Sequence, residues 1–209
     1  MLNLLFGARS KARDDGHAIV ARLYDEIVRA TRQPGPYVHW GVPDTLDGRY
    51  DMLVLHAFVV FHRLGTLMRE EAARAGVPET RTEPAGLSQA LFNHMMRDLD
   101  TNLREAGVSD IRIGAKVKAR TKAFYGRVAA YEAGLAESGD AVLRDALDRN
   151  VYTTVAAPPE GLSALVAYMR GLVAESAGWS WDDLARGTVT LEPANPIGGE
   201  SATDLEGTP

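Results

Sequence analysis

The stretch from Phe92 to Tyr131 reads FNHMMRDLDTNLREAGVSDIRIGAKVKARTKAFYGRVAAY, and it decides the fold class of this chain. Its first part is amphipathic and ends in acidic residues, a short segment containing Gly107 interrupts it, and a long basic part follows. A glycine just beyond a helix end commonly takes the left-handed conformation that stops the helix. The stretch therefore predicts two long helices joined by a tight turn.

The apolar spacing inside this stretch supports both helices. The first follows Thr82 as its cap, carries Pro84 in its first turn, and places one face along Leu87, Leu91, His94, Met95, Asp98 and Asn102. The second spans residues 111–137, and its apolar residues keep a heptad-like spacing through Ile113, Val117, Phe124, Val128, Tyr131 and Leu135.

The same helical period extends in both directions along the chain. It predicts helices over residues 16–32, 49–75 and 141–150, a sixth opened by Pro158-Pro159, and a final turn capped by Ser180 with Asp183. Asp44 or Asp47 is the expected cap of the second helix, and residues 37–43 form an aromatic loop. The fold class is all-α, a single bundle or irregular array of about six helices.

Composition divides the chain into three parts. Residues 1–14 are expected to form an N-terminal arm and 15–187 the helical domain. Residues 188–209 are rich in Pro, Gly, Ser, Thr and acidic residues, which predicts a disordered acidic tail. The formal net charge of −5 belongs to the C-terminal end, because residues 182–209 hold six acidic residues and one basic residue. This balance argues against DNA as a partner.

Several function classes lack their signatures. The chain contains no cysteine, which excludes thiol catalysis and cysteine-based metal sites. Phosphate-binding and hydrolase motifs are missing, and His56 and His62 are six residues apart, so they cannot form a metal pair on one helix face. We therefore expect a protein that is not an enzyme and holds no cofactor or metal. The most apolar run, Met52 to Phe61, is shorter than a membrane span and predicts a buried helix.

The basic helix has two compatible interpretations. Residues 111–130 contain no acidic residue and hold six basic ones: Arg112, Lys116, Lys118, Arg120, Lys122 and Arg127. They form either a solvated face paired across the hairpin with Asp98, Asp100, Glu105 and Asp110, or a surface for an anionic partner such as a protein loop, a lipid headgroup or ribosomal RNA. Gly114 and Gly126 indicate close approach of another helix, unless the helix begins after Gly114.

The N-terminal segment also has two interpretations. Leu2, Leu4, Leu5 and Phe6 precede Arg9, Lys11 and Arg13, an order suited to an anionic membrane surface. The alternative is an arm that docks on the bundle or frays.

The quoted stretch resembles the ubiquinol–cytochrome c chaperone family, whose members help to assemble the respiratory cytochrome bc1 complex. The resemblance covers roughly residues 15–155 and is strongest over 92–131. It rests on Phe92, Met96, Asp98, Asp100, Asn102, Leu103, Arg104, Glu105, Gly107, Val108, Asp110, Gly114, Lys116, Val117, Lys118, Ala123, Phe124, Tyr125, Gly126, Arg127, Ala130 and Tyr131.

The resemblance implies an α-helical assembly chaperone that binds newly made cytochrome b. Mitochondrial relatives act with a small partner protein at the ribosome. This chain is similar to a bacterial member, expected in the cytoplasm or peripheral at the inner membrane, with the ribosome or an anionic membrane surface as further partners. The alternatives are a helical module for another peptide or membrane client, and a haem or small-molecule binder that uses His56, His62 or His94.

The expected client site is a groove between the helices of the quoted stretch, flanked by Phe92, Met95, Met96, Phe124 and Tyr125. Flexible, polarisable methionines suit such a surface. The full set of expected partner-binding residues is Phe92, Met95, Met96, Asp98, Asp100, Arg104, Asp110, Arg112, Lys116, Lys118, Arg120, Phe124, Tyr125 and Arg127.

Overall fold

The computed structural model describes residues 2–105, 107 and 109–193, and within them the chain is all-α, which confirms the predicted fold class. The side chains of residues 2–14, 110 and 111 lie outside this description. The helices in chain order are α1 (Leu2–Thr31), α2 (Gly35–His39), α3 (Leu46–Ala75), the 3₁₀ turn η1 (Glu79–Arg81), α4 (Glu83–Glu105), α5 (Asp110–Ala136), α6 (Ala141–Val151), α7 (Pro159–Ser176) and α8 (Trp181–Arg186).

Helix α3 is the centre of the core and contacts α1, α4, α5, α6 and α7. Nearly every residue from Met52 to Val60 is buried, which confirms the predicted buried helix. The length and composition of α3 would also allow it to cross a membrane, but core helices pass the same test. Its cap is Thr45, whose side chain accepts a hydrogen bond from the Gly48 amide at 3.1 Å, so the expected aspartate cap was wrong.

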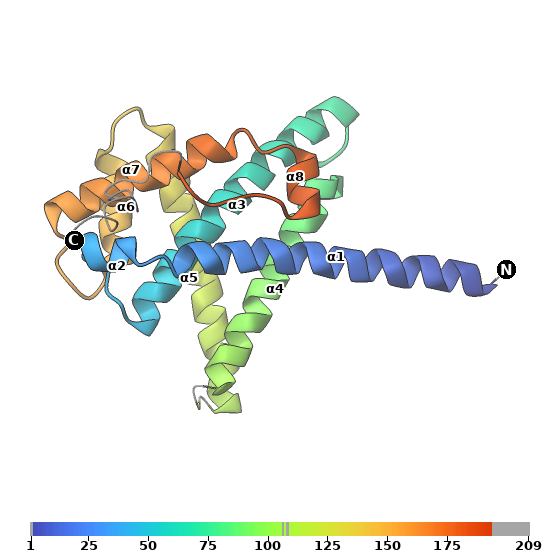
Figure 1. Ribbon diagram of the computed structural model, residues 1–209, viewed down its shortest axis with the longest axis horizontal. Helices are drawn as coiled ribbons and strands as arrows, with labels where there is room; N and C mark the ends of the chain where they lie inside the picture. The colour runs from blue at the N-terminus through green and yellow to red at the C-terminus, as the bar shows by residue number, and fades with distance from the viewer. Residues whose placement is uncertain (1, 106, 108, 194–209) are drawn as a thin grey trace, which may run out of the picture.

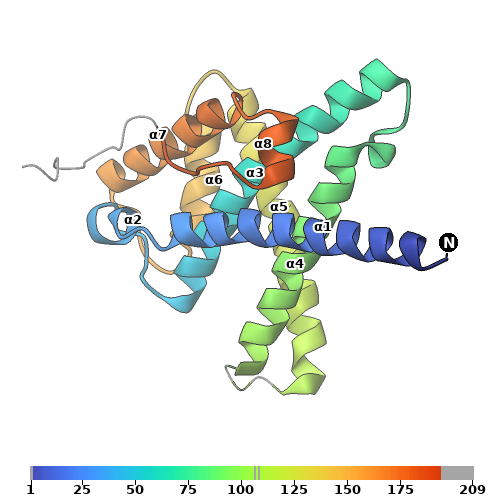
Figure 2. The same ribbon diagram turned by 45° about the vertical axis from the view of Figure 1, so that its right-hand side comes forward.

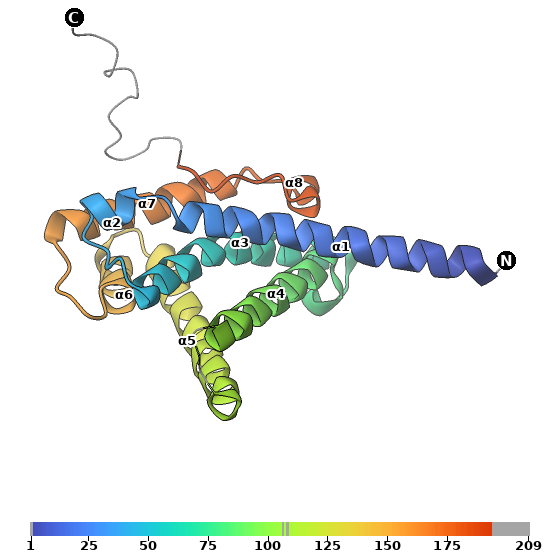
Figure 3. The same ribbon diagram turned by 60° about the horizontal axis from the view of Figure 1, so that its bottom comes forward.

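Helix α1 begins at Leu2, far before the predicted start near residue 16. Its N-terminal turns extend past the other helices in all three views (Figures 1–3). Residues 16–32 are helical up to Thr31, as the sequence predicts, and Val20, Leu23, Ile27 and Ala30 of this part are all buried. The division into an arm and a domain remains a prediction.

Helices α4 and α5 form an antiparallel hairpin whose turn projects from the body of the molecule, as Figures 1 and 2 show. Figure 3, turned about the other axis, shows the same projection. Gly107 lies in the turn with φ 77°, as the sequence predicts. The hairpin carries most of the residues that the sequence singles out, so their environment depends on what α4 and α5 pack against.

The close helix approach expected at Gly114 and Gly126 is wrong. A Cβ at either position would meet nothing within 4 Å, and α5 begins before Gly114. The close approach occurs at Gly134, where an added Cβ would lie 2.6 Å from the Leu143 Cα of α6. This contact holds the C-terminal half of α5 against α6.

The C-terminal part departs from the sequence analysis in one respect. The capping box of α8 is present, with Ser180 Oγ accepting from the Asp183 amide at 3.2 Å. The expectation of disorder from Thr188 onward was wrong for residues 188–193. Val189 and Leu191 are buried, and the Leu191 amide donates to Glu26 Oε1 of α1 at 2.6 Å. Their side chains offset the ordering entropy that a polar tail could not. Residues 194–209 lie outside the described residues.

Candidate binding pocket between helices α1, α3 and α4

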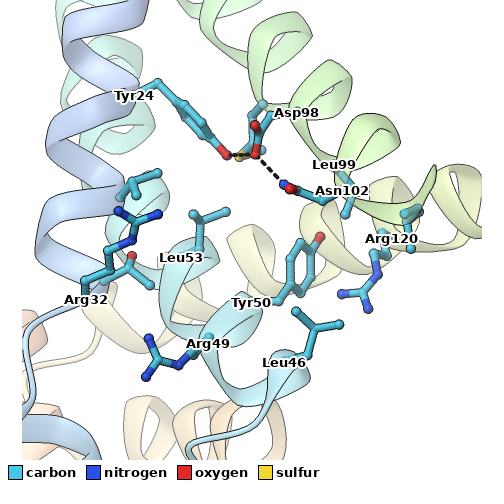
Figure 4. A pocket seen from close by; sticks show the side chains of 14 residues that line it. Tyr24, Arg32, Leu46, Arg49, Tyr50, Leu53, Asp98, Leu99, Asn102 and Arg120 are labelled. Carbon is cyan, nitrogen blue, oxygen red and sulfur yellow. Dashed lines mark hydrogen bonds between the residues drawn. The ribbon is translucent and has the colours of Figure 1, made fainter. Parts of the chain in front are cut away.

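A pocket of about 350 Å³ opens where α1, α3 and α4 meet, with Arg120 of α5 at one side (Figure 4). Its walls are mostly apolar and come from three helices. Val28 belongs to α1, Leu53 to α3, and Met95, Leu99 and Leu103 to α4. Leu46, in the first turn of α3, stands at the opening and is 71% exposed. An exposed leucine beside an apolar pocket marks a surface suited to an apolar partner.

A polar cluster of α1 and α4 lies at one end of the pocket. The Tyr24 hydroxyl donates a hydrogen bond to Asp98 Oδ2 at 2.6 Å, and Asn102 Nδ2 donates to the same oxygen at 2.8 Å. Burial and the neighbouring carboxylate raise the pKa of Tyr24, so its hydroxyl keeps its proton. The cluster fixes the spacing of α1 and α4.

Three arginines from three parts of the chain surround the pocket. Arg49 pairs with Asp44 at 2.6 Å. Arg120 pairs with Asp47 at 2.9 Å and lies over the Tyr50 ring, 4.2 Å from its centroid. Arg32 follows the last turn of α1, and its exposed guanidinium has no hydrogen bond or ion pair within the described part of the chain. The rim thus offers one uncompensated positive charge.

The structure brings only some of the predicted site residues to this pocket. Met95, Asp98 and Arg120 line it. Four others, namely Phe92, Met96, Phe124 and Tyr125, lie between α4 and α5 instead. The rings of Phe92, Phe124 and Tyr125 pack with centroids 5.5–5.6 Å apart, and Thr121 Oγ1 donates to the Met96 sulfur at 3.3 Å. Phe92, Met96 and Phe124 therefore occupy the space where the sequence predicts an open groove, whereas Tyr125 is 57% exposed. The pocket lies on a neighbouring face of α4.

The basic residues of the predicted basic helix, now α5, lie in two different environments. Arg112, Lys116 and Lys118 are exposed on the projecting half of α5. Arg120 and Arg127 turn toward α3, where they pair with Asp47 and Asp51. The expected pairing across the α4–α5 hairpin is therefore wrong for these two arginines. Asp100 pairs within α4, 2.8 Å from Arg104, and the side chain of Asp110 lies outside the described residues.

The Arg127–Asp51 pair lies at 2.5 Å, and Asp51 is only 3% exposed. Burial raises the pKa of the Asp51 carboxyl to about 6, although Arg127 opposes the shift. The hydroxyls of Tyr50 and Tyr131 and the Arg127 Nε are also buried and have no hydrogen-bond partner among the described residues. The junction of α3 and α5 thus holds a cluster of largely buried polar groups.

The histidines offered as haem ligands have structural contacts. His56 is fully buried, with Nδ1 3.1 Å from Thr31 Oγ1 and Nε2 2.8 Å from the Tyr168 hydroxyl. Burial lowers the pKa of His56 to about 4, so the ring is neutral. His62 Nδ1 lies 2.8 Å from Glu132, and the His94 ring packs on Tyr24. A ligand at His56 would have to replace two hydrogen bonds in the core.

Sequence reasoning missed much of the pocket because its residues come from distant segments. The sequence spacing places Met95, Asp98 and Asn102 on one helix face, and in the structure this face lines the pocket. That spacing could have indicated this wall of the site. Tyr24 and Arg32 carry no such signal, since their proximity to α4 exists only in the folded chain.

The described part of the chain is thus an all-α helical array with an apolar pocket bordered by arginines. The family model described as ubiquinol-cytochrome C chaperone matches residues 38–191, and the chain belongs to this family. The crystal structure of the Cbp3 homologue from Brucella abortus is similar, with 33% sequence identity and a TM-score of 0.71, over 91% of this chain and 96% of that one. No curated protein matches the chain. Membership of a chaperone family implies a role other than catalysis.

Proposed function

We propose that this protein is an assembly chaperone of the ubiquinol–cytochrome c reductase (bc1) complex and that it binds newly made cytochrome b. The family and the Brucella relative support the assembly role. The observation that carries the binding role is the pocket between α1, α3 and α4, with apolar walls and exposed Leu46 at its opening.

The physical reason is the exposed apolar surface of a membrane subunit before it is assembled. Burying apolar area releases about 25 cal/mol for each Å², so an apolar pocket competes with non-specific aggregation of such a segment. A pocket of about 350 Å³ falls in the range of small-ligand sites, so it takes a few side chains rather than a whole helix. The rest of the segment would lie across the neighbouring surface of α3 and α4.

The exposed basic residues of α5 add a second element to the proposal. Arg112, Lys116 and Lys118 lie on the projecting hairpin, where an anionic client loop, lipid headgroup or ribosomal RNA can reach them. A protein in the cytoplasm, peripheral at the inner membrane, would meet its client there as it is made.

The first experiment is deletion of the gene, followed by measurement of cytochrome b and of ubiquinol–cytochrome c reductase activity in membranes. We expect both to fall while the cytochrome b transcript is unchanged, and the wild-type gene to restore them. Normal levels of both would refute the assembly role.

A matched pair of variants then tests the pocket. Leu46→Glu places a charge at the opening, whereas Val38→Glu places one on α2, outside the pocket lining. Both positions are similarly exposed, at 71% and 68%, so neither substitution buries a charge. We expect Leu46→Glu to lose co-isolation of cytochrome b and Val38→Glu to retain it, with unchanged melting temperatures. Equal retention by both folded variants would exclude this pocket as the client site.

A further inference from the structure

The rim of the α1–α3–α4 pocket contains one positive charge that no described residue pairs with. Of the three arginines, Arg49 and Arg120 pair with Asp44 and Asp47. Arg32 has no side-chain hydrogen bond or ion pair within the described residues. In Figure 4, the Arg32 side chain lies beside the gap between α1 and α3, next to Leu53.

The acidic group of the pocket is already engaged. Asp98 Oδ2 accepts hydrogen bonds from Tyr24 and Asn102, so the carboxylate is held by two neutral donors at the α4 side. Asp44 and Asp47 are each paired with another arginine of the lining, namely Arg49 and Arg120. The Asp98 carboxylate keeps its charge but is held at the α4 side by hydrogen bonds, whereas Arg32 is the lining arginine whose side chain has no hydrogen bond or ion pair among the described residues.

From this arrangement we infer that the pocket selects an apolar segment of the client that carries a carboxylate at its flank, with Arg32 as the residue that recognises the carboxylate. The inference rests on the proposed function for the identity of the client, but the chemistry comes from the pocket itself. The apolar side chains enter between Leu53, Met95 and Leu99, while a guanidinium binds a carboxylate through two parallel hydrogen bonds.

Charge selection also suits a chaperone that must release its client. A rim ion pair is solvated and contributes little affinity by itself. The ion pair fixes the register of the bound segment and favours an acidic flank. A basic flank would be repelled by Arg32, and a neutral flank would form no ion pair. The apolar contacts would give the affinity and Arg32 the choice of segment.

The test uses three labelled synthetic peptides that share one leucine-rich helical segment and differ at a single flanking residue, which is Glu, Gln or Lys. Binding to the full-length protein is measured by fluorescence anisotropy at low and high salt. We expect the Glu peptide to bind about fivefold more tightly than the Gln peptide, which corresponds to about 1 kcal/mol for a solvated ion pair. The preference should fall at high salt, because screening acts on the ion pair and not on the apolar contacts.

A charge swap separates recognition from a general field. Arg32→Glu should reverse the order, so that the Lys peptide binds more tightly than the Glu peptide. The matched control is Arg97→Glu, an exposed arginine of α4 outside the pocket lining, which should leave the order unchanged. Reversal by both variants, or by neither, would overturn the role of Arg32.

Two further outcomes have defined meanings. If the fatty acid dodecanoate binds with Arg32 dependence while no peptide binds, the pocket takes a lipid and the inference is wrong. If the wild-type protein captures cytochrome b but ignores the charge of the peptide flank, the inference fails and the proposed function stands. A peptide preference without capture of cytochrome b would support the inferred chemistry and refute the proposed client.

Discussion

The buried pair of Asp51 and Arg127 makes a prediction about the pH dependence of folding. The pKa of Asp51 is about 6 in the folded protein, whereas the ordinary value for an aspartate is 3.8. Because the folded pKa is higher, the folded state holds the proton more tightly, and its stability from this group is greatest at low pH. Stability is then lost as the pH rises through the window between the two pKa values, from 3.8 to about 6. Each pKa unit of difference corresponds to about 1.4 kcal/mol.

The perturbation that isolates this effect is Asp51→Asn, which keeps the shape of the side chain and removes its titration. The full loss of stability for the wild type is about 3 kcal/mol across the window, of which about 1.5 kcal/mol falls between pH 5 and pH 7.5. The variant loses its ion pair to Arg127, but arginine stays charged throughout, so this penalty is constant with pH. Other groups titrate alike in both proteins and cancel in the difference.

The assay is urea unfolding of both proteins at several pH values between 5 and 7.5. We expect the free energy of unfolding of Asp51→Asn, relative to wild type, to rise by about 1.5 kcal/mol toward higher pH. Thermal unfolding should show the same trend as a relative gain of about 3–6 °C in melting temperature. Parallel profiles, or a trend in the opposite direction, would show that Asp51 is not held with a raised pKa and would refute the reasoning.

Four other substitutions have expected outcomes in unfolding experiments. Gly126→Ala should stabilise the protein by up to about 1 kcal/mol, because an added methyl group meets no atom within 4 Å and alanine favours helix. Gly134→Ala should destabilise it by about 1–3 kcal/mol, because the added methyl group clashes with α6. Equal effects of the two substitutions would contradict the assigned packing. Tyr168→Phe should lower the free energy of unfolding by about 1–3 kcal/mol, because it leaves Nε2 of buried His56 without a partner, and an unchanged urea midpoint would argue against that hydrogen bond. Leu191→Ala should cost about 2–5 kcal/mol if residues 188–193 complete the core, while a neutral result would return them to the tail.

The helical content of this fold was accessible from the sequence because apolar spacing depends only on local geometry. The hairpin turn at Gly107 and the α8 capping box were predictable for the same reason, since each depends on a few adjacent residues. The packing of residues 188–193 was not predictable in this way. Val189 and Leu191 look like an isolated pair of apolar residues until α1 is present to receive them.

The candidate site shows the same limit more strongly. Sequence spacing placed Met95 and Asp98 on one face of α4, and the structure uses that face. It could not indicate that Arg120 turns toward Asp47 of α3 while Lys116, one turn away, stays exposed. Their difference depends on the angle at which α5 meets α3, and an isolated helix carries no information about that angle.

The hydrogen bond from the Leu191 amide to Glu26 joins positions 165 residues apart and has a consequence for synthesis. Helix α1 is translated long before Leu191, which is buried and bonds to it. Domains that depend on such distant pairs close slowly and late. A molecule proposed to protect an unfinished membrane subunit would itself stay unfinished until Leu191 has been translated, so a truncated copy lacking residues 188–193 should be degraded rather than act on a client.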